Sequence, residues 1–143
     1  MLVESLEVGV VGAGYVGLAM GACLAYLGQR VACLDRDEGW VESLEKGKVP
    51  FYEPGLEGMV ARGIRDGRLT FAGSMGLDSV VSGADVVFVA VGTPQWDDGS
   101  ADLSNVADVA RRIGRSLAGE AAEARRRPLV VVNKSTVPVG GGD

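Results

Sequence analysis

The chain has 143 residues, of which 47% are hydrophobic and 23% charged, a balance that fits one globular domain with its own core and excludes a disordered or fibrous protein. Fourteen basic and nineteen acidic residues leave a net charge of -5, which argues against a nucleic-acid-binding surface. No apolar run approaches the roughly 20 residues of a membrane span, and no signal sequence opens the chain, so we expect a cytoplasmic protein. The absence of histidine excludes histidine-based acid–base chemistry and histidine metal ligands, and we assign no metal site.

Strand and helix patterns alternate along the chain. Apolar and β-branched runs predict strands at Glu7–Val11, Val31–Leu34, Leu69–Ala72, Asp85–Val91 and Pro128–Asn133. Helical spacing predicts helices at Tyr15–Leu27, Glu38–Lys46, Gly55–Gly63, Leu77–Ser82 and Ser104–Leu117. This alternation predicts a single α/β domain, a Rossmann-type doubly wound parallel sheet with helices on both faces. The continuously apolar runs Val86–Val91 and Leu129–Val132 are expected to be central strands.

The first predicted strand and helix are joined by a GxGxxG turn. In such a turn Gly12 takes the tight bend, Gly14 leaves space for a pyrophosphate, and Gly17 lets the helix lie close to the strand. The phosphates would meet free N–H groups at the helix N-terminus. Asp35 follows about 20 residues later, where a carboxylate accepts hydrogen bonds from the adenosine ribose and repels the 2′-phosphate of NADP. The turn therefore predicts an NAD site, and Arg36 keeps NADP open as the alternative.

Polar residues follow the fourth and fifth predicted strands, and parallel strands place such residues at the ligand-binding edge of a sheet. Gly92 permits close backbone approach, and Thr93 and Thr136 offer hydroxyl groups suited to ribose or carboxamide atoms. Alternatively, the Thr93-Pro94 and Val137-Pro138 pairs only mark turns.

The connection from Gly47 to Leu56 is long for a link between two helices and carries two prolines and two aromatic residues. This composition predicts a rigid, functional loop. The alternative is that Phe51 and Tyr52 only fill the space between the two helices.

Several side chains have structural rather than chemical expectations. Cys23, on the apolar stripe of the first helix, and Cys33, inside a strand, are expected to be buried reduced thiols without a catalytic role. The last helix is expected to expose Arg111, Arg112 and Arg115 to solvent. The run Arg125 to Arg127 is likewise expected to stay hydrated ahead of the last strand.

Seven segments are spread along nearly the whole chain: GAGYVGL at 12–18, Asp35 with Asp37, PFYEPGL at 50–56, RLTF at 68–71, ADVVFVAVGTP at 84–94, DGSADLSNV at 98–106 and KSTVPVG at 134–140. In this order they resemble the N-terminal part of the nucleotide-sugar dehydrogenases, the UDP-glucose/GDP-mannose dehydrogenase family. Members of this family oxidise a sugar alcohol to an acid with two NAD. The tyrosine before EPGL and the DGSADL stretch are more similar to members that use UDP-glucose than to those that use GDP-mannose or UDP-N-acetylmannosamine.

The resemblance implies which residues contact NAD. The cofactor-binding residues are expected to be Gly12, Ala13, Gly14, Tyr15, Val16 and Gly17 at the pyrophosphate, Asp35 with the neighbouring Arg36 at the adenosine, Val91, Gly92 and Thr93 after the fourth strand, and Ser135 and Thr136 near the nicotinamide. One position departs from the family pattern, because Trp40 stands five residues beyond Asp35, where members usually have a lysine or arginine. Either Arg36 replaces that basic side chain or the adenosine side binds more weakly.

In the family, the catalytic cysteine, its assisting lysine, asparagine and aspartate, and most UDP-sugar contacts come from a central helical region and a C-terminal domain. Residues 1–143 are expected to form only the NAD-binding domain, with no catalytic residue of their own. The resemblance thus implies an NAD cofactor, a UDP-sugar substrate that is oxidised to UDP-glucuronate, no membrane or nucleic-acid partner, and a homo-oligomer for the full-length enzyme. The chain alone is expected to bind NAD without turning over UDP-glucose.

Three alternatives stay open. The first is a dehydrogenase for GDP-mannose or UDP-N-acetylmannosamine, and the second is a cofactor-binding fragment that has lost its function. The third is a stand-alone NAD-sensing module, which would share the glycine turn and Asp35 but has no evident need for the 50–56 loop or the KSTVPVG segment.

Overall fold

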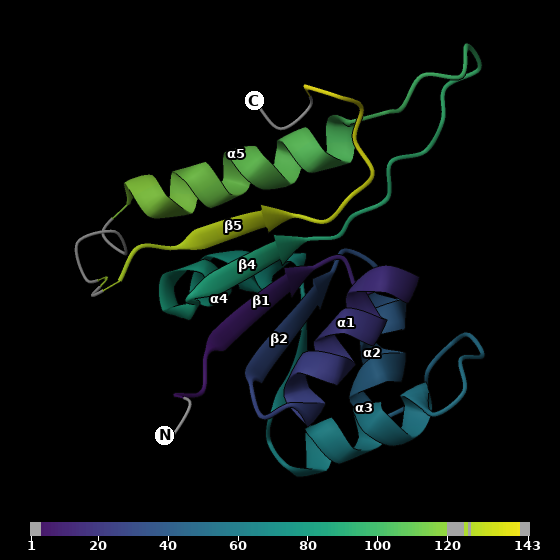
Figure 1. The fold of residues 1–143 in the computed structure, drawn as a ribbon, viewed down its shortest axis with the longest axis vertical. Coiled ribbons are helices and arrows are strands. Elements are labelled where there is room, and N and C mark those ends of the chain that lie inside the picture. Colours follow the sequence, from purple (N-terminus) through teal and green to yellow (C-terminus); the bar gives the residue numbers. More distant parts are fainter. Residues whose placement is uncertain (1–3, 120–124, 126, 141–143) are drawn as a thin grey trace.

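The computed structural model describes residues 4–119, 125 and 127–140, and these form a parallel five-stranded sheet in the order β3-β2-β1-β4-β5 (Figure 1). The strands are β1 (Glu7–Val11), β2 (Arg30–Asp35), β3 (Leu69–Gly73), β4 (Val86–Val89) and β5 (Val130–Asn133). The helices are α1 (Tyr15–Tyr26), α2 (Glu38–Glu45), α3 (Leu56–Arg65), the short 3₁₀ turn η1 (Ser74–Gly76), α4 (Leu77–Gly83) and α5 (Ser104–Ala118). Every predicted strand and helix is present, and the ends shift by two residues at most.

Helices cover both faces of the sheet, which confirms the predicted doubly wound α/β fold. Because successive side chains of a strand point to opposite faces, β1 contributes Val8 and Val10 to one core and Val11 to the other. The first core lies under α1, α2 and α3, and the second lies under α4 and α5. Across the described ranges, every helix is too short or too polar to traverse a lipid bilayer.

The prediction that both apolar runs are central strands is right for β4 and wrong for β5. Strand β4 lies between β1 and β5, and Val87 is fully buried. Strand β5 pairs with β4 alone among the described strands, and Val130 and Val131 are 53% and 46% exposed. An apolar run indicates that a strand can be buried, but the elements packed against the strand determine which of its side chains are covered.

Helix α1 buries only part of its predicted apolar stripe: Leu18 and Ala22 are buried, whereas Cys23 is not. The helix is apolar on nearly every side, so periodicity alone does not show which side meets the sheet. The small residues Gly21 and Ala25 face the core, and a Cβ on Gly21 would lie 2.6 Å from the sulfur of Cys33. This close packing turns Cys23 outward, so the prediction that Cys23 is buried is wrong, while the prediction that Cys33 is buried is confirmed.

Two arginines that were expected in solvent contact the protein instead. Arg112 is half-buried and donates from Nη2 to the Ser74 carbonyl oxygen (2.6 Å). Arg125 is half-buried and donates to the carbonyl oxygens of Val81 and Ala84 at the end of α4, where carbonyl groups lack helical partners. Arg111, Arg115 and Arg127 are exposed as expected, and Arg126 lies outside the described residues.

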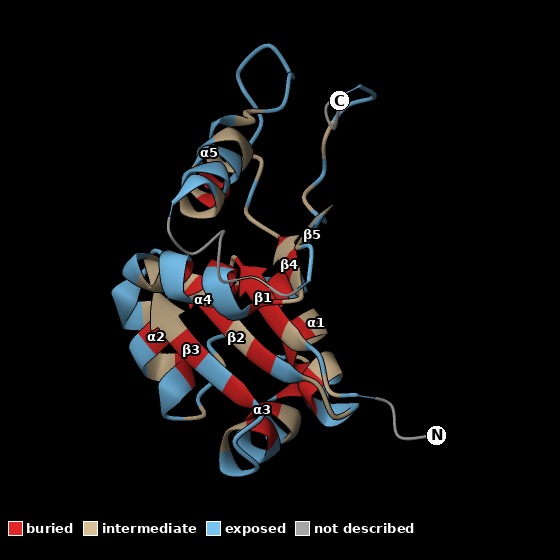
Figure 2. Cartoon of the chain, turned by 90° about the vertical axis from the view of Figure 1, so that its left-hand side faces the viewer, coloured by how far each residue is buried: buried red, intermediate tan, exposed pale blue. Residues whose placement is uncertain are grey.

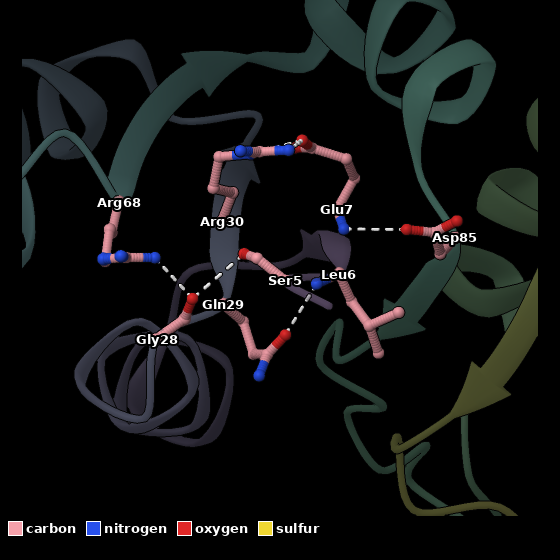
Figure 3. A network of polar contacts seen from close by, with 8 residues as sticks. All are labelled: Ser5, Leu6, Glu7, Gly28, Gln29, Arg30, Arg68 and Asp85. Carbon is pink, nitrogen blue, oxygen red and sulfur yellow. Dashed lines mark hydrogen bonds and ion pairs between the residues drawn. The ribbon is translucent and has the colours of Figure 1, made fainter. Parts of the chain in front are cut away.

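A network of polar contacts links neighbouring strands at their amino ends (Figure 3). Ser5 Oγ donates to the Gly28 carbonyl oxygen (3.0 Å), and the Glu7 backbone N–H donates to Asp85 Oδ2 (2.9 Å). The Arg30 guanidinium pairs with the Glu7 carboxylate. These contacts join the start of β1 to the start of β2 on one side and to the residue before β4 on the other. The amino-terminal end of the sheet is therefore occupied by protein groups.

Candidate functional site

A tight turn at the carboxyl end of β1 begins the candidate site. Gly12 has a φ of +100°, and a Cβ there would lie 2.5 Å from the Ala90 carbonyl oxygen, so only glycine fits. A Cβ on Gly17 would lie 1.8 Å from the Gly12 carbonyl oxygen, which shows how closely α1 approaches the turn. A Cβ on Gly14 would meet nothing within 4 Å. The turn is therefore tightly packed at Gly12 and Gly17 and open in front of Gly14.

The first turn of α1 leaves backbone donors without partners. Gly14 is the N-cap and supplies no capping side chain, and no acidic residue stands in the first turn. The first N–H that bonds back is that of Leu18, which donates to the Gly14 carbonyl oxygen (2.9 Å). Within the described part of the chain, the N–H groups of Tyr15 and Val16 have no protein acceptor. Such a helix end binds anions through its free donors and its partial positive charge.

Asp35, the last residue of β2, holds the turn in place. Its Oδ2 accepts a hydrogen bond from the Ala13 N–H (2.9 Å), and its Oδ1 accepts one from the Asp37 N–H (3.0 Å). The Gly12 N–H donates to the Leu34 carbonyl oxygen (2.8 Å). Each carboxylate oxygen keeps a second lone pair, and Asp35 is only half-buried. The carboxylate is therefore both fixed and able to accept further hydrogen bonds from ligand hydroxyl groups.

A pocket of about 420 Å³ opens at this edge of the sheet, a volume within the usual range of small-molecule sites. Predicted cofactor-binding residues that line it are Gly12, Gly14, Asp35, Arg36, Val91 and Gly92. The remaining lining residues are Val11, Leu34, Ser74, Leu77, Ala90, Pro94, Asn105, Asp108, Val109 and Arg112. The parallel topology thus brings the turn, the acid and the segment after β4 together, as the strand order requires.

Other predicted site residues surround the pocket without lining it. Ala13 and Gly17 are buried behind the turn, and Tyr15 and Val16 are exposed on the first turn of α1. Thr93 is half-buried next to the lining residues Gly92 and Pro94.

The KSTVPVG segment contacts the end of β4 rather than the pocket. Ser135 Oγ donates to the Val91 carbonyl oxygen (2.7 Å), and the Ser135 N–H donates to the Val89 carbonyl oxygen (3.0 Å). Thr136 is exposed. Ser135 therefore fixes the position of Val91, which does line the pocket.

The wall opposite the glycine turn comes from residues that sequence reasoning missed. Asn105 donates from Nδ2 to the Gly92 carbonyl oxygen (3.0 Å) and accepts from Arg36 Nη1 (3.2 Å). Arg112, bound to the Ser74 carbonyl oxygen, and Asp108 line the same wall. The signal for this wall was topological, because the helix that follows β4 in a doubly wound sheet begins beside the carboxyl edge. Helical periodicity alone marks these residues as polar and hence solvated.

The connection between α2 and α3 divides its two aromatic residues between different environments. Phe51 is half-buried and packs between Trp40 and Tyr15, with ring centroids 6.1 Å and 5.0 Å away. Tyr52 is 89% exposed. The space-filling alternative is therefore right for Phe51 and wrong for Tyr52.

The sheet order, the glycine turn on a helix N-terminus and the acid at the end of β2 define a dinucleotide-binding domain of the Rossmann type. The model of the UDP-glucose/GDP-mannose dehydrogenase family, NAD binding domain, matches residues 6–143. The chain belongs to this family and forms its NAD-binding domain.

Individual relatives agree with this assignment. The chain is 48% identical over 139 residues to UDP-glucose 6-dehydrogenase of Rhizobium meliloti (strain 1021), covering 96% of the chain and 30% of that protein. Its structure is similar to a UDP-glucose dehydrogenase from the hyperthermophilic archaeon Pyrobaculum islandicum (TM-score 0.83, 42% identity, 96% of this chain and 30% of that one). It is also similar to GDP-mannose dehydrogenase from Pseudomonas aeruginosa (TM-score 0.83, 33% identity, 94% and 29%). The chain thus spans about 30% of the length of these proteins.

Proposed function

We propose that this chain holds NAD for a dehydrogenase that oxidises UDP-glucose to UDP-glucuronate. The observation that carries the proposal is the convergence on one pocket of the open Gly14 position and the anchored carboxylate of Asp35. The choice of UDP-glucose is supported by the relative at 48% identity, which is a UDP-glucose 6-dehydrogenase. The neighbour at 33% identity, a GDP-mannose dehydrogenase, is more distant in sequence.

Each part of the site has its own role in this proposal. The N–H groups of Tyr15 and Val16 hold the pyrophosphate, and Asp35 accepts hydrogen bonds from the adenosine ribose. The segment 91–93 and the residues Ser135 and Thr136 stand toward the nicotinamide half. When bound, NAD supplies an acceptor for the hydride of the sugar alcohol, while the protein binds and orients it.

The charge of the site favours NAD over NADP. The carboxylate of Asp35 would repel a 2′-phosphate on the adenosine ribose. Arg36 is the residue that could attract that phosphate, and its Nη1 is already engaged with Asn105 Oδ1. We therefore expect a clear preference for the cofactor without the extra phosphate.

The groups that react with the sugar are proposed to lie outside this domain. Oxidation of a primary alcohol to an acid requires a base for the hydroxyl proton and, for the second step, a thiolate to hold the aldehyde. Burial raises the pKa of the Cys33 thiol to about 12, and neither Cys33 nor the exposed Cys23 lines the pocket. The chain by itself is therefore expected to bind the cofactor without oxidising a sugar.

Calorimetric titration with NAD and NADP tests the cofactor assignment. The wild-type chain is expected to bind NAD more tightly than NADP, and Asp35→Asn is expected to weaken NAD binding by about tenfold, as for loss of charge-assisted hydrogen bonds. Asp97→Asn is the matched control, since Asp97 is exposed and does not line the pocket. Undetectable NAD binding by the wild-type chain would refute the proposal.

An activity assay tests the rest of the proposal. Incubation of the chain with NAD and UDP-glucose is expected to yield no NADH, and NADH formation would show that the reacting groups lie within these residues. When the chain is produced together with the coding sequence that follows it in the genome, we expect NADH from UDP-glucose. NADH from GDP-mannose instead would assign the other substrate of the family.

A further inference from the structure

Trp40 links helix α2 to the glycine turn. Its indole Nε1–H donates to the Ala13 carbonyl oxygen (2.8 Å), and its ring stacks on Phe51 with 24° between the ring planes. The N-cap residue Asp37 accepts a hydrogen bond from the Trp40 N–H (3.0 Å) and so fixes where α2 begins. The main chain of Trp40 is therefore fixed by Asp37, and its half-buried indole is held at the ring face and at the nitrogen.

The peptide groups of Ala13 are held from two directions. The Ala13 N–H donates to Asp35 Oδ2 (2.9 Å), and the Ala13 carbonyl oxygen accepts from Trp40. Both partners belong to the short segment from the end of β2 to the start of α2, and the Ala13 side chain is fully buried. Ala13 immediately precedes Gly14 and the free N–H groups of α1. The orientation of those donors therefore depends on the two hydrogen bonds at Ala13.

Phe51 extends this support to the first residue of α1. The ring of Tyr15 lies 5.0 Å from that of Phe51, and the Tyr15 hydroxyl donates to the Glu53 carboxylate, which raises the pKa of the phenol. The rings of Tyr15, Phe51 and Trp40 form an aromatic cluster that joins the amino end of α1 to the loop between α2 and α3. The cluster braces the same helix end that carries the unpaired donors.

We propose that Trp40 is a positioning residue for the pyrophosphate of the cofactor, acting through the Ala13 carbonyl group. This inference rests on the proposed function, because it concerns the same site. By fixing Ala13, the indole keeps the N–H groups of the turn oriented before the ligand arrives, and preorganised donors lose less freedom on binding. Trp40 itself lines no part of the pocket, so its contribution to affinity is indirect.

The variant Trp40→Phe isolates the indole N–H, because it keeps an aromatic ring against Phe51 and removes the donor. NAD and ADP-ribose are expected to bind about fivefold more weakly, the factor that one hydrogen bond supplies. Adenosine, which has no phosphate, is expected to bind as it does to the wild type. Trp96→Phe is the matched control: the chain has two tryptophans, and Trp96 is 58% exposed and outside the pocket.

A second measurement follows Trp40 in the unaltered chain. In a ¹⁵N–¹H NMR spectrum each of the two tryptophans gives one indole resonance, and Trp96→Phe identifies which is which. The Trp40 resonance is expected to shift when NAD or ADP-ribose binds and to stay in place with adenosine. Together with the affinities, this shift separates a role toward the phosphates from a purely structural role. In a purely structural role, Trp40→Phe would weaken the binding of NAD, ADP-ribose and adenosine alike.

Three outcomes would overturn the inference: unchanged NAD affinity in Trp40→Phe, equal weakening of NAD and adenosine, or a Trp40 resonance that does not move when NAD binds. Each of these leaves the proposed function intact, since the wild-type chain still binds NAD. A wild-type chain that binds no NAD would instead overturn the proposed function and this inference together.

Discussion

The half of the sheet made by β1, β2 and β3 is enclosed more completely than the half made by β4 and β5. Val10 of β1 is fully buried, whereas Val130 of β5 is 53% exposed, although both lie in valine-rich strands. Figure 2 shows red buried stretches along β1, β2, β3 and β4, whereas β5 has no buried residue. The hydrogen bonds that fix the cofactor turn, from Asp35, Trp40 and Leu34, come from the enclosed half. The lesson is that a rigid anion site requires close packing behind it.

The two halves also differ in how they meet the ligand pocket. The enclosed half supplies a turn whose peptide groups are held by Asp35 and Trp40. The β4–β5 half supplies Val91 and Gly92, which are held by Ser135 and Asn105 from neighbouring segments. We therefore expect substitutions behind the turn to affect stability most and those on the far wall to affect it least.

The largest effect is expected for Gly17→Ala in the enclosed half. The added Cβ would lie 1.8 Å from the Gly12 carbonyl oxygen, so α1 must move away from the turn. We expect a loss of at least about 3 kcal/mol in the free energy of unfolding, measured by urea denaturation. Gly14→Ala is the counterpart, since its Cβ meets nothing within 4 Å, and it should leave the fold intact while weakening NAD binding. Equal stability of the two variants would contradict the packing of α1 on the turn.

Matched valine truncations compare the halves directly. Val10→Ala removes two buried methyl groups and is expected to cost about 2 to 3 kcal/mol. Val130→Ala, on the exposed strand β5, is expected to cost under about 1 kcal/mol. Both costs are to be measured from the denaturation midpoints, provided that the dependence of the unfolding free energy on denaturant concentration is unchanged. A cost at Val130 as large as that at Val10 would mean that the exposed face of β5 is covered in solution.

The reactivity of the two cysteines shows how well the core of the enclosed half is shielded from solvent reagents. Because burial raises the pKa of Cys33 to about 12, its thiolate is scarce at pH 8, and the side chain is also shielded from reagents. Cys23 is exposed. Labelling with a disulfide reagent at pH 8 is expected to modify Cys23 rapidly and Cys33 only after denaturation. Cys23→Ser should abolish the rapid phase, and rapid labelling that survives in this variant would show that the core opens.

The smallest effect is expected at the contact that joins the two halves. Asn105 bridges Arg36 of the first half and Gly92 of the second, and Asn105→Ala removes both hydrogen bonds at an incompletely buried site. We expect NAD affinity to fall about two- to threefold, because solvent-accessible hydrogen bonds contribute little net free energy. Calorimetry with Ser104→Ala as the control measures this, since Ser104 is exposed outside the pocket. A tenfold loss would show that the bridge closes on the bound cofactor.

Local patterns were sufficient for the elements and for one side of the pocket. Gly12, Gly14 and Asp35 lie where the GxGxxG spacing and the acid after β2 place them, because a strand, a turn and a helix that are adjacent in the chain have few ways to pack. The burial of Cys33 also follows from an apolar run in a strand with helices on both sides of the sheet.

Local patterns failed where burial depends on contacts between distant segments. Cys23 turned outward because the glycines of α1 set the side that meets the sheet, and an all-apolar helix carries no periodic signal for this. Arg112 and Arg125 are half-buried because carbonyl oxygens of other elements, at Ser74 and at the end of α4, accept hydrogen bonds from their guanidinium groups. In the sequence Trp40 stands out only because the family usually has a lysine or arginine at this position. Its hydrogen bond to Ala13 joins residues that are 27 positions apart.

By itself, the sequence determined the order of strands and helices, the glycine turn, the acid that faces it and the family to which the chain belongs. These features are encoded in spacing, which the backbone geometry of each element converts into position. Only the tertiary structure decided which side of α1 is buried, that β5 lies at an edge, and that Asn105 and Arg112 complete the pocket wall. It also showed that an indole holds the turn. The physical reason is that these properties depend on which distant groups meet, and side-chain type alone does not specify the partner.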